Sequence, residues 1–323
     1  MLISRRTMVA GAAACLPIAR AEAQSWPSRR MTLIVPFAPG GTPDIVARLI
    51  AGVMSNRLGH AVVVENRAGA SGNIGTNAIA KAPPDGHTFG LSILGPLVTN
   101  QTLMGSLPYD AWKELTPISH VTSQPAALVV PPSSAMRTFE DFVATMRSNG
   151  DRINYGSIGS GSTGHLSMAL TLQLIGSNAV HVPFNGSPLV VTALLRGDVQ
   201  VGMIPLGGVG EFVRDRRLRL LAVTTARRST FFPDAPTFAE QGFPRVVGDG
   251  WIGCVAPAGL HPAVVERLAA EVRFALSDPD VRDKLQTQYL EPVGSTPVEF
   301  AQLLESERDR WLTIIRENGI TGG

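Results

Sequence analysis

Cysteine is nearly absent from this chain, which has 2 cysteines in 323 residues. Cys15 lies in an N-terminal stretch with the features of an export leader, so the mature chain keeps Cys254 alone. A single cysteine cannot form an intramolecular disulfide. The sequence Ala12-Ala13-Ala14-Cys15 also lacks the large apolar residue expected before a lipid-modified cysteine, which argues against a lipoprotein.

The apolar run near the N-terminus, residues 9–18, is too short to cross a bilayer. Arg5 and Arg6 precede it, and Ala21-Glu22-Ala23 follows as an A-x-A cleavage pattern. We therefore expect residues 1–23 to be a signal peptide cleaved near Ala23. The basic pair fits either a twin-arginine or an ordinary secretory signal, and both place the mature protein in the periplasm.

Neither sign of charge is in excess. The chain has 28 Lys and Arg and 26 Asp and Glu. The leader holds Arg5, Arg6, Arg20 and Glu22, and removing these three bases and one acid leaves 25 residues of each sign. A balanced chain has no basic field, so we expect neither nucleic acid nor a membrane surface as a partner.

Sequence patterns for catalysis and metal binding are missing. The chain has no G-x-S-x-G, and its six histidines show no metal-ligand spacing. We expect no catalytic residues, no metal and no cofactor. One alternative stays open. It is an exported hydrolase in which Ser157, Ser160 or Ser162 pairs with His165. No orienting acid is evident for it, and His165 is better interpreted as capping or lining a pocket.

Glycine, in contrast, gathers in loops, and Gly159-Ser160-Gly161-Ser162-Thr163-Gly164 matches G-x-G-x-x-G. In dinucleotide sites an acid at the end of the following strand binds the ribose. Here that strand ends in Phe184-Asn185, and the loop has no lysine for a P-loop. These two absences argue against a nucleotide site, although a nucleotide-binding enzyme remains part of the alternative.

Apolar runs alternate with helical patterns along the rest of the chain, which predicts an α/β fold of parallel β-α-β units. We expect a signal peptide (1–23), a first lobe (24–129), a second lobe (130–248) and a return to the first lobe (249–323). Two crossings between lobes, near 126–131 and 249–256, make a hinge. The expected strands are 31–37, 61–66, 89–94, 153–157, 179–184, 199–204, 218–225 and 251–259, and the expected helices include 44–59, 73–82, 138–148, 165–175, 189–196 and 297–318.

The two predicted lobes share one sequence motif. "VPFAPGGTPD" (35–44) and "VPFNGSPL" (182–189) each end a strand, turn at glycine and start a helix, with Thr42 or Ser187 expected as the cap and proline at the first helical position. The first amides of a helix lack intrahelical partners and favour an anion. With the Gly159 loop, three such turns are predicted over two lobes. Asp44 would repel an anion if it faced the ligand, so we expect it to point aside.

These segments resemble a known family. "VVVENRAGASGNIGTNAIAKAPPDGHT", "LPYDAWKELTPISHV", "INYGSIGSGSTGHLS", "LLAVTTARRSTFFPDAPTFAEQGFP" and "WIGCVAPAG", with both helix-start motifs, resemble the tripartite tricarboxylate transporter solute-binding proteins, the Bug or TctC-like receptors. The resemblance runs in order from about Trp26 to the C-terminus.

The resemblance implies a type II periplasmic-binding-protein fold: two α/β lobes, joined by a two-strand hinge, close on a ligand. It implies a monomer that captures a di-, tri- or aromatic carboxylate for TctA- and TctB-like membrane subunits. A receptor that instead feeds a two-component sensor remains an alternative. Carried onto this chain, the ligand-binding residues are Phe37, Ala38, Gly40, Gly41, Thr42, Ser157, Gly159, Gly161, Ser162, Thr163, His165, Phe184, Asn185 and Gly186.

The chain departs from its relatives where the distal part of the ligand is expected. Pro205-Leu206-Gly207-Gly208 replaces an acid and Asn, and the strand 89–94 is followed by Gly95-Pro96. The residues expected to set specificity are Ser92, Pro96, Met203 and Pro205. Their uncharged character favours a ligand with an aromatic or aliphatic distal part.

Overall fold

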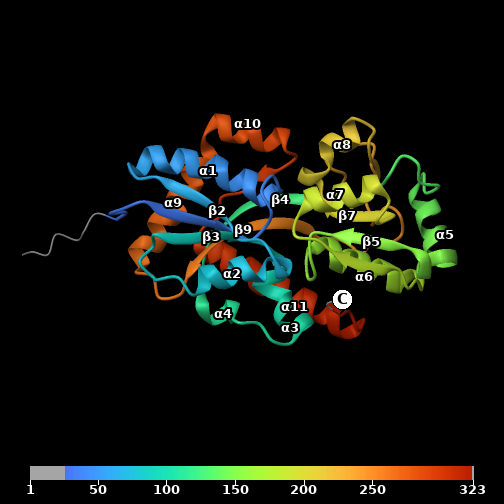
Figure 1. The fold of residues 1–323 in the computed structure, drawn as a ribbon, viewed down its shortest axis with the longest axis horizontal. Coiled ribbons are helices and arrows are strands. Elements are labelled where there is room, and N and C mark those ends of the chain that lie inside the picture. Colours follow the sequence, from blue (N-terminus) through green and yellow to red (C-terminus); the bar gives the residue numbers. More distant parts are fainter. Residues whose placement is uncertain (1–25, 322–323) are drawn as a thin grey trace, which may run out of the picture.

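The computed structural model describes residues 26–321, so the predicted signal peptide lies outside the described residues. Two α/β lobes share strands β4 (Leu115–Val130) and β9 (Asp249–Pro257), which lie in the middle of Figure 1. These strands are antiparallel neighbours, paired from Leu115↔Pro257 to Pro125↔Asp249. The chain therefore passes between the lobes on two adjacent strands, as predicted. The residue limits of the lobes stay a prediction.

Lobe 1 contains a sheet in the order β2-β1-β3-β9-β4, with helices on both faces (Figure 1). Strands β1, β2 and β3 are parallel, and β3 pairs with β9 in the antiparallel sense. Its elements are β1 (Met31–Val35), α1 (Thr42–Leu58), β2 (Val62–Asn66), α2 (Asn73–Ala80), β3 (Thr88–Ser92), η2 (Gly95–Thr99), α3 (Asn100–Met104), α4 (Ala111–Glu114), α9 (Pro262–Ser277), α10 (Pro279–Thr287), β10 (Glu291–Pro292) and α11 (Pro297–Glu317).

Strand β1 explains the two helical layers, because both of its faces are apolar. Met31, Leu33 and Val35 pack with α1 and α9, whereas Ile34 packs on the opposite face with α2 and α11. Side chains alternate along a strand, so a strand with buried apolar residues on both faces must be covered on both sides.

Lobe 2 continues the sheet through β4-β7-β5-β6, with β8 also paired to β4. Strand β5 is parallel to β6 and β7, while β4 and β7 are antiparallel. Its elements are α5 (Phe139–Asn149), β5 (Asn154–Ser157), α6 (Thr163–Ile175), β6 (Val180–Pro183), α7 (Ser187–Arg196), β7 (Val201–Pro205), η4 (Leu206–Gly208), α8 (Gly210–Arg214) and β8 (Arg219–Val223).

Strand β4 is the main element that the sequence did not predict as a strand. It runs for 16 residues but contains Pro117 and Pro125 and several polar residues, so it shows no simple apolar run. Its pairing with β9 shifts register twice, between Pro117 and Ser119 and between His120 and Thr122. The sheet is consequently mixed, with parallel units on either side of an antiparallel hinge.

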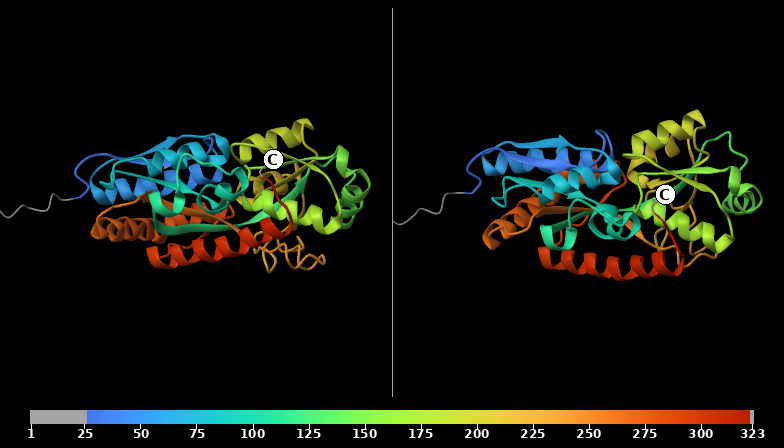
Figure 2. Two further views of the ribbon diagram at one scale, coloured as in Figure 1. Left: turned by 90° about the horizontal axis from the view of Figure 1, so that it is seen from below. Right: turned by 60° about the horizontal axis from the view of Figure 1, so that its bottom comes forward.

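The C-terminal helices pack on lobe 1. Helix α11 starts with a capping box, in which Thr296 Oγ1 accepts from the Glu299 amide at 3.2 Å and Glu299 Oε2 accepts from the Thr296 amide at 2.8 Å. The helix runs along lobe 1 and ends beside lobe 2 (Figure 2), where Glu317 pairs with Arg245 at 3.3 Å.

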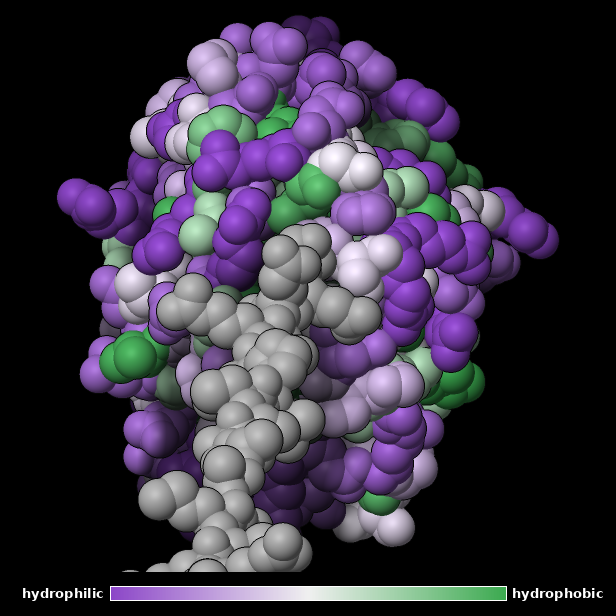
Figure 3. All heavy atoms as spheres, turned by 90° about the vertical axis from the view of Figure 1, so that its left-hand side faces the viewer, coloured by the Kyte–Doolittle hydropathy of each residue, from purple (hydrophilic) through white to green (hydrophobic). Residues whose placement is uncertain are grey.

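The outer end of lobe 1 is mostly hydrophilic on the face seen in Figure 3, with hydrophobic residues scattered between polar ones. Within residues 26–321, no helix is long and apolar enough to cross a membrane.

Candidate functional site

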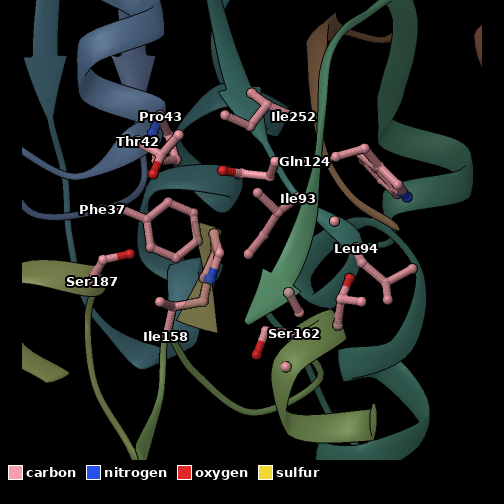
Figure 4. Close-up of a pocket in the computed structure, with 17 residues that line it drawn as sticks. Phe37, Thr42, Pro43, Ile93, Leu94, Gln124, Ile158, Ser162, Ser187 and Ile252 are labelled. Atoms are coloured by element: carbon pink, nitrogen blue, oxygen red, sulfur yellow. The ribbon is translucent and has the colours of Figure 1, made fainter. Parts of the chain in front are cut away.

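A cavity lies between the two lobes, next to the hinge (Figure 4). Only about 30 Å³ of it is open to the centres of water molecules, which is room for roughly two waters. The lobes are thus closed on each other, and an organic ligand can enter only if they separate. The lining residues are Phe37, Thr42, Pro43, Ile93, Leu94, Gln124, Ala126, Ile158, Ser162, Thr163, Gly164, Gly186, Ser187, Pro205, Gly250, Trp251 and Ile252.

Three helices begin at this cavity: α1 from lobe 1, and α6 and α7 from lobe 2. Figure 4 shows Thr42, Pro43 and Ser187 on one side of the pocket, Leu94 and Ser162 on the other, and Ile93 between them. The positive ends of three helix dipoles therefore face one buried space.

Helices α1 and α7 begin without a side-chain cap. Their N-cap residues are Gly41 and Gly186, and each helix has a proline in its first turn. The sequence interpretation of Thr42 and Ser187 as caps was wrong, because these residues are already helical and make no cap hydrogen bond. Thr42 Oγ1 is buried and has no partner among the described residues. Both helix starts consequently keep donors for a ligand.

Helix α6 differs, because its own N-cap side chain is used. Ser162 Oγ accepts from the His165 amide at 3.3 Å. One of the first amides of this helix is therefore satisfied within the protein. The α6 start still keeps the Thr163 and Gly164 amides, whereas Pro43 and Pro188 carry no N–H and the Asp44 amide of α1 donates to the Gly41 carbonyl at 2.9 Å.

Asp44 points aside from the cavity, as expected. Its carboxylate accepts from the Gly40 amide at 2.9 Å, from Asn66 Nδ2 at 2.9 Å and from Arg48 Nε at 3.0 Å. Burial alone would raise the pKa of Asp44, but these hydrogen bonds and the charge of Arg48 lower it below its ordinary value. The ionised carboxylate thus holds the turn before α1 in place.

Part of the predicted site lines the cavity, namely Phe37, Thr42, Ser162, Thr163, Gly186 and, of the specificity candidates, Pro205. Ala38, Gly40, Gly41, Phe184 and Asn185 belong to the two turns behind it. The Ala38 amide donates to the Asn185 carbonyl at 3.1 Å, which joins these turns across the lobes.

Three specificity candidates do not line the cavity. Ser92 Oγ bonds to Thr76 Oγ1 at 2.9 Å, and the Pro96 carbonyl accepts from Tyr109 Oη at 2.8 Å. Met203 is fully buried. The end of strand β3 instead presents Ile93 and Leu94 to the cavity.

Gly159 and Gly161 face lobe 1 and not the cavity. The amide of Ser160 between them donates to Ser71 Oγ at 3.0 Å, and the Gly161 carbonyl accepts from Thr99 Oγ1 at 2.9 Å. A Cβ atom at Gly161 would lie 2.6 Å from Thr99 Oγ1. The sequence predicted ligand contacts for these glycines, whereas in the closed arrangement they bring the lobes into direct contact.

We expect Gly161→Ala to oppose closure, because the new methyl group collides with lobe 1 at a cost of about 1–3 kcal/mol. Small-angle scattering should give a larger radius of gyration for this variant than for the wild type. Gly176→Ala is the matched control, since Gly176 has a similar φ of +70° but no neighbour within 4 Å. If Gly161→Ala and Gly176→Ala had the same radius of gyration as a closed wild type, Gly161 would not be needed for the contact between the lobes.

Ser157 does not pair with His165. Ser157 Oγ lies 2.7 Å from Nε2 of His181, a residue that the sequence analysis did not single out. The rings of His165 and His181 are stacked at 4.0 Å, and His165 Nδ1 accepts from the Gly161 amide at 3.0 Å. Ser157 is fully buried, and a Ser157–His165 pair is not formed. The histidines instead support the loop that contacts lobe 1.

Burial lowers the pKa of His165 to about 4. Burial, together with the neighbouring His165, also holds the pKa of His181 far below its ordinary value. Both rings are neutral in the folded protein at pH 7. Histidines in the unfolded chain bind protons from about pH 6.5 downward. The free energy of unfolding therefore falls as the pH drops from about 6.5 towards 4.

Urea unfolding should reveal this loss. Between pH 7.5 and pH 5 we expect the two histidines to lower the free energy of unfolding by roughly 2–4 kcal/mol. His181→Phe, which keeps an aromatic ring, should lose less stability over this interval than the wild type. His60→Gln, at a partly exposed position after α1, is the control and should follow the wild type. The same pH dependence in all three proteins would rule out the buried histidines as its source.

The residues that the sequence analysis missed are mostly apolar lining residues: Ile93, Leu94, Ile158, Trp251 and Ile252. A signal existed for Ile93 and Leu94, because ligands of α/β sheets sit at the carboxyl ends of strands. The hinge residues Gln124 and Trp251 gave no such signal.

Comparisons with known proteins agree with this geometry. A family described as the tripartite tricarboxylate transporter family receptor matches residues 46–320. BugT of Bordetella pertussis is 35% identical and covers 92% of each chain. A solved structure of R. palustris Rpa4515 with adipate is 34% identical with a TM-score of 0.87, covering 92% of this chain and 99% of its own. The periplasmic binding protein BugD is 27% identical with a TM-score of 0.84, covering 92% and 99%. The predicted periplasmic-binding-protein fold is confirmed.

Proposed function

Because this chain belongs to the tripartite tricarboxylate transporter receptor family, we propose that it captures a small organic carboxylate in the periplasm and presents it to the membrane subunits of a secondary transporter. The ligand binds in the cavity between the lobes. No bond is made or broken, and the work of the protein is selective capture and closure. The open lobes admit the ligand, and contacts from both lobes stabilise the closed form.

The observation that carries this proposal is the meeting of two uncapped helix starts. Helix α1 comes from lobe 1 and α7 from lobe 2, and both open on the same buried cavity. Free amides and the positive dipole ends attract an anion, and a carboxylate can accept from both helices with its two oxygens. An anion held between them links the two lobes.

The donors at this end of the cavity are neutral. Thr42 contributes a buried hydroxyl without a partner, and Ser187 lies opposite on α7. Gln124 Oε1 accepts from the Gly207 amide at 3.2 Å, which fixes the side-chain amide beside them. Buried polar groups are rarely left unpaired, so a hydroxyl such as that of Thr42 is suited to a ligand oxygen.

The relatives support the same class of ligand. The R. palustris protein at 34% identity was solved with adipate, a carboxylate. Its fold covers 92% of this chain, and the family contains receptors of a carboxylate transporter. We therefore assign carboxylates, and not nucleotides, to the cavity.

A thermal-shift screen of residues 24–323 tests this assignment. The panel contains mono-, di- and tricarboxylates, aromatic acids, amino acids and NAD. A ligand at a hundred times its dissociation constant should stabilise the protein by about 2.7 kcal/mol, which raises Tm by several degrees. A shift with NAD and none with any acid would contradict the proposal.

Thr42→Val tests the placement of the carboxylate. The substitution keeps the side-chain shape and removes the buried hydroxyl, so binding should weaken by about 1–3 kcal/mol, as for a lost hydrogen bond to a charged group. Calorimetry with the acid found in the screen measures the change. Thr192→Val, on an exposed position of α7, is the control and should bind like the wild type. Equal affinities for both variants would show that the carboxylate lies elsewhere.

A further inference from the structure

We propose that Gln124 is a ligand-binding residue, and that its side-chain N–H donates to the carboxylate held at the starts of α1 and α7. This inference rests on the proposed function, because it takes a carboxylate in the cavity as given. It adds a donor from the hinge, and it requires the ligand to present a hydrogen-bond acceptor at this position.

Gln124 lies on β4 where the chain passes between the lobes. It pairs with Gly250 of β9, and two residues later Ala126 pairs with Pro205 of the lobe 2 strand β7. Its side chain is buried and lines the cavity together with Gly250. A Cβ atom on Gly250 would lie 3.7 Å from Gln124 Cγ, so this glycine borders the stem of the side chain. Gln124 is thus placed to contact both lobes and a ligand at once.

Lobe 2 fixes the orientation of the side-chain amide. The Gly207 amide donates to Gln124 Oε1 at 3.2 Å. A backbone N–H cannot accept a hydrogen bond, so the oxygen faces Gly207 and Nε2 takes the other position of the planar group. A Cβ atom on Gly207 would lie 2.8 Å from Gln124 Oε1 and 3.3 Å from Thr42 Cγ2. Figure 4 shows Gln124 extending towards Thr42, so the amide lies at the same end of the cavity as the α1 start.

The nitrogen of this amide has no partner in the protein. Among residues 26–321, none accepts a hydrogen bond from Gln124 Nε2, and Thr42 Oγ1 close by is also unpaired there. Buried polar groups are rarely left without a partner. Two such groups at one end of a cavity supply side-chain donors for the oxygens of a carboxylate.

Neutral donors carry the recognition, because no residue of the lining has a charged side chain. Gln124 Nε2 donates and does not accept, so a carboxylate oxygen satisfies it and an ammonium group does not. Gln124 also links binding to the hinge. Its backbone pairs with β9, its Oε1 bonds to lobe 2 and its Nε2 is directed to the ligand.

Gln124→Glu tests this contact on the mature protein. The substitution keeps the shape of the side chain and an oxygen for the Gly207 amide, but it replaces the donor by a second acceptor. At pH 8 the new carboxylate repels that of the ligand. Calorimetry with adipate, or with the acid that raises Tm most in the screen, should show affinity reduced at least about a hundredfold.

The loss in Gln124→Glu should depend on pH. Two carboxylates that share a site cannot both ionise easily, so the pKa of one is raised and binding takes up a proton. The dissociation constant of this variant should therefore fall by about tenfold per unit between pH 8 and pH 6. The wild type should stay nearly constant, because its lining has no titratable side chain. Asp249, beside Pro125 in the hinge, and its charged neighbours Glu291 and Glu307 are present in both proteins.

Two further variants separate a contact from a structural role. Gln124→Met keeps the length of the side chain and removes its hydrogen bonds, so binding should weaken roughly 10- to 100-fold without pH dependence. Gln200→Glu is the matched control, since Gln200 Oε1 also accepts from a backbone amide, that of Asn154 at 2.9 Å, outside the lining. It should bind like the wild type.

The outcomes distinguish this inference from the proposed function. Wild-type affinity in Gln124→Met, or a loss in Gln124→Glu that does not vary with pH, would overturn the contact and leave the carboxylate receptor standing. A wild-type protein that binds no mono-, di- or tricarboxylate would overturn the proposed function and this inference with it.

Discussion

The starts of α1 and α7, where the Thr42 and Ser187 amides have no partner within their helices, are the constraint on which the rest of the site depends. Gly41 and Gly186 cannot cap their helices with a side chain, and the following Thr42 and Ser187 do not do so either. Buried donors need a partner, and the two helices belong to different lobes. In the proposed binding mode, an anion that satisfies both helix starts draws the lobes together. Ligand recognition and closure are in this way one event.

The hinge strands and the direct contacts between the lobes constrain how the lobes close. Strands β4 and β9 connect the lobes side by side, so the lobes remain hydrogen-bonded at the hinge while the cavity opens. At a second point Ser160 and Gly161 bond directly to Ser71 and Thr99 of lobe 1. These contacts form only when no side chain intervenes, which explains glycine at 159 and 161. Closure is supported by protein–protein contacts as well as by the ligand.

Much of this architecture could be predicted from the sequence, because apolar runs and helix-start motifs are local signals. The echo of "VPFAPGGTPD" and "VPFNGSPL" correctly located two helix starts that meet at the cavity. Local signals do not show which side of a turn faces a ligand. Gly159 and Gly161 therefore lay in a correctly predicted loop and yet contact lobe 1, and Ser157 bonds to His181, 24 residues away in sequence. The apolar lining from β4 and β9 depends on strand pairing over more than 100 residues, such as Gln124↔Gly250, which no local pattern encodes.

A crystal structure of the protein with a bound carboxylic acid tests the central claim most directly. The account predicts that the carboxylate oxygens lie within hydrogen-bond distance of the first amides of both α1 and α7, with Thr42 Oγ1 donating to one of them. A carboxylate held by the Gly159–Gly164 turn, with the α1 and α7 amides left to water, would contradict it.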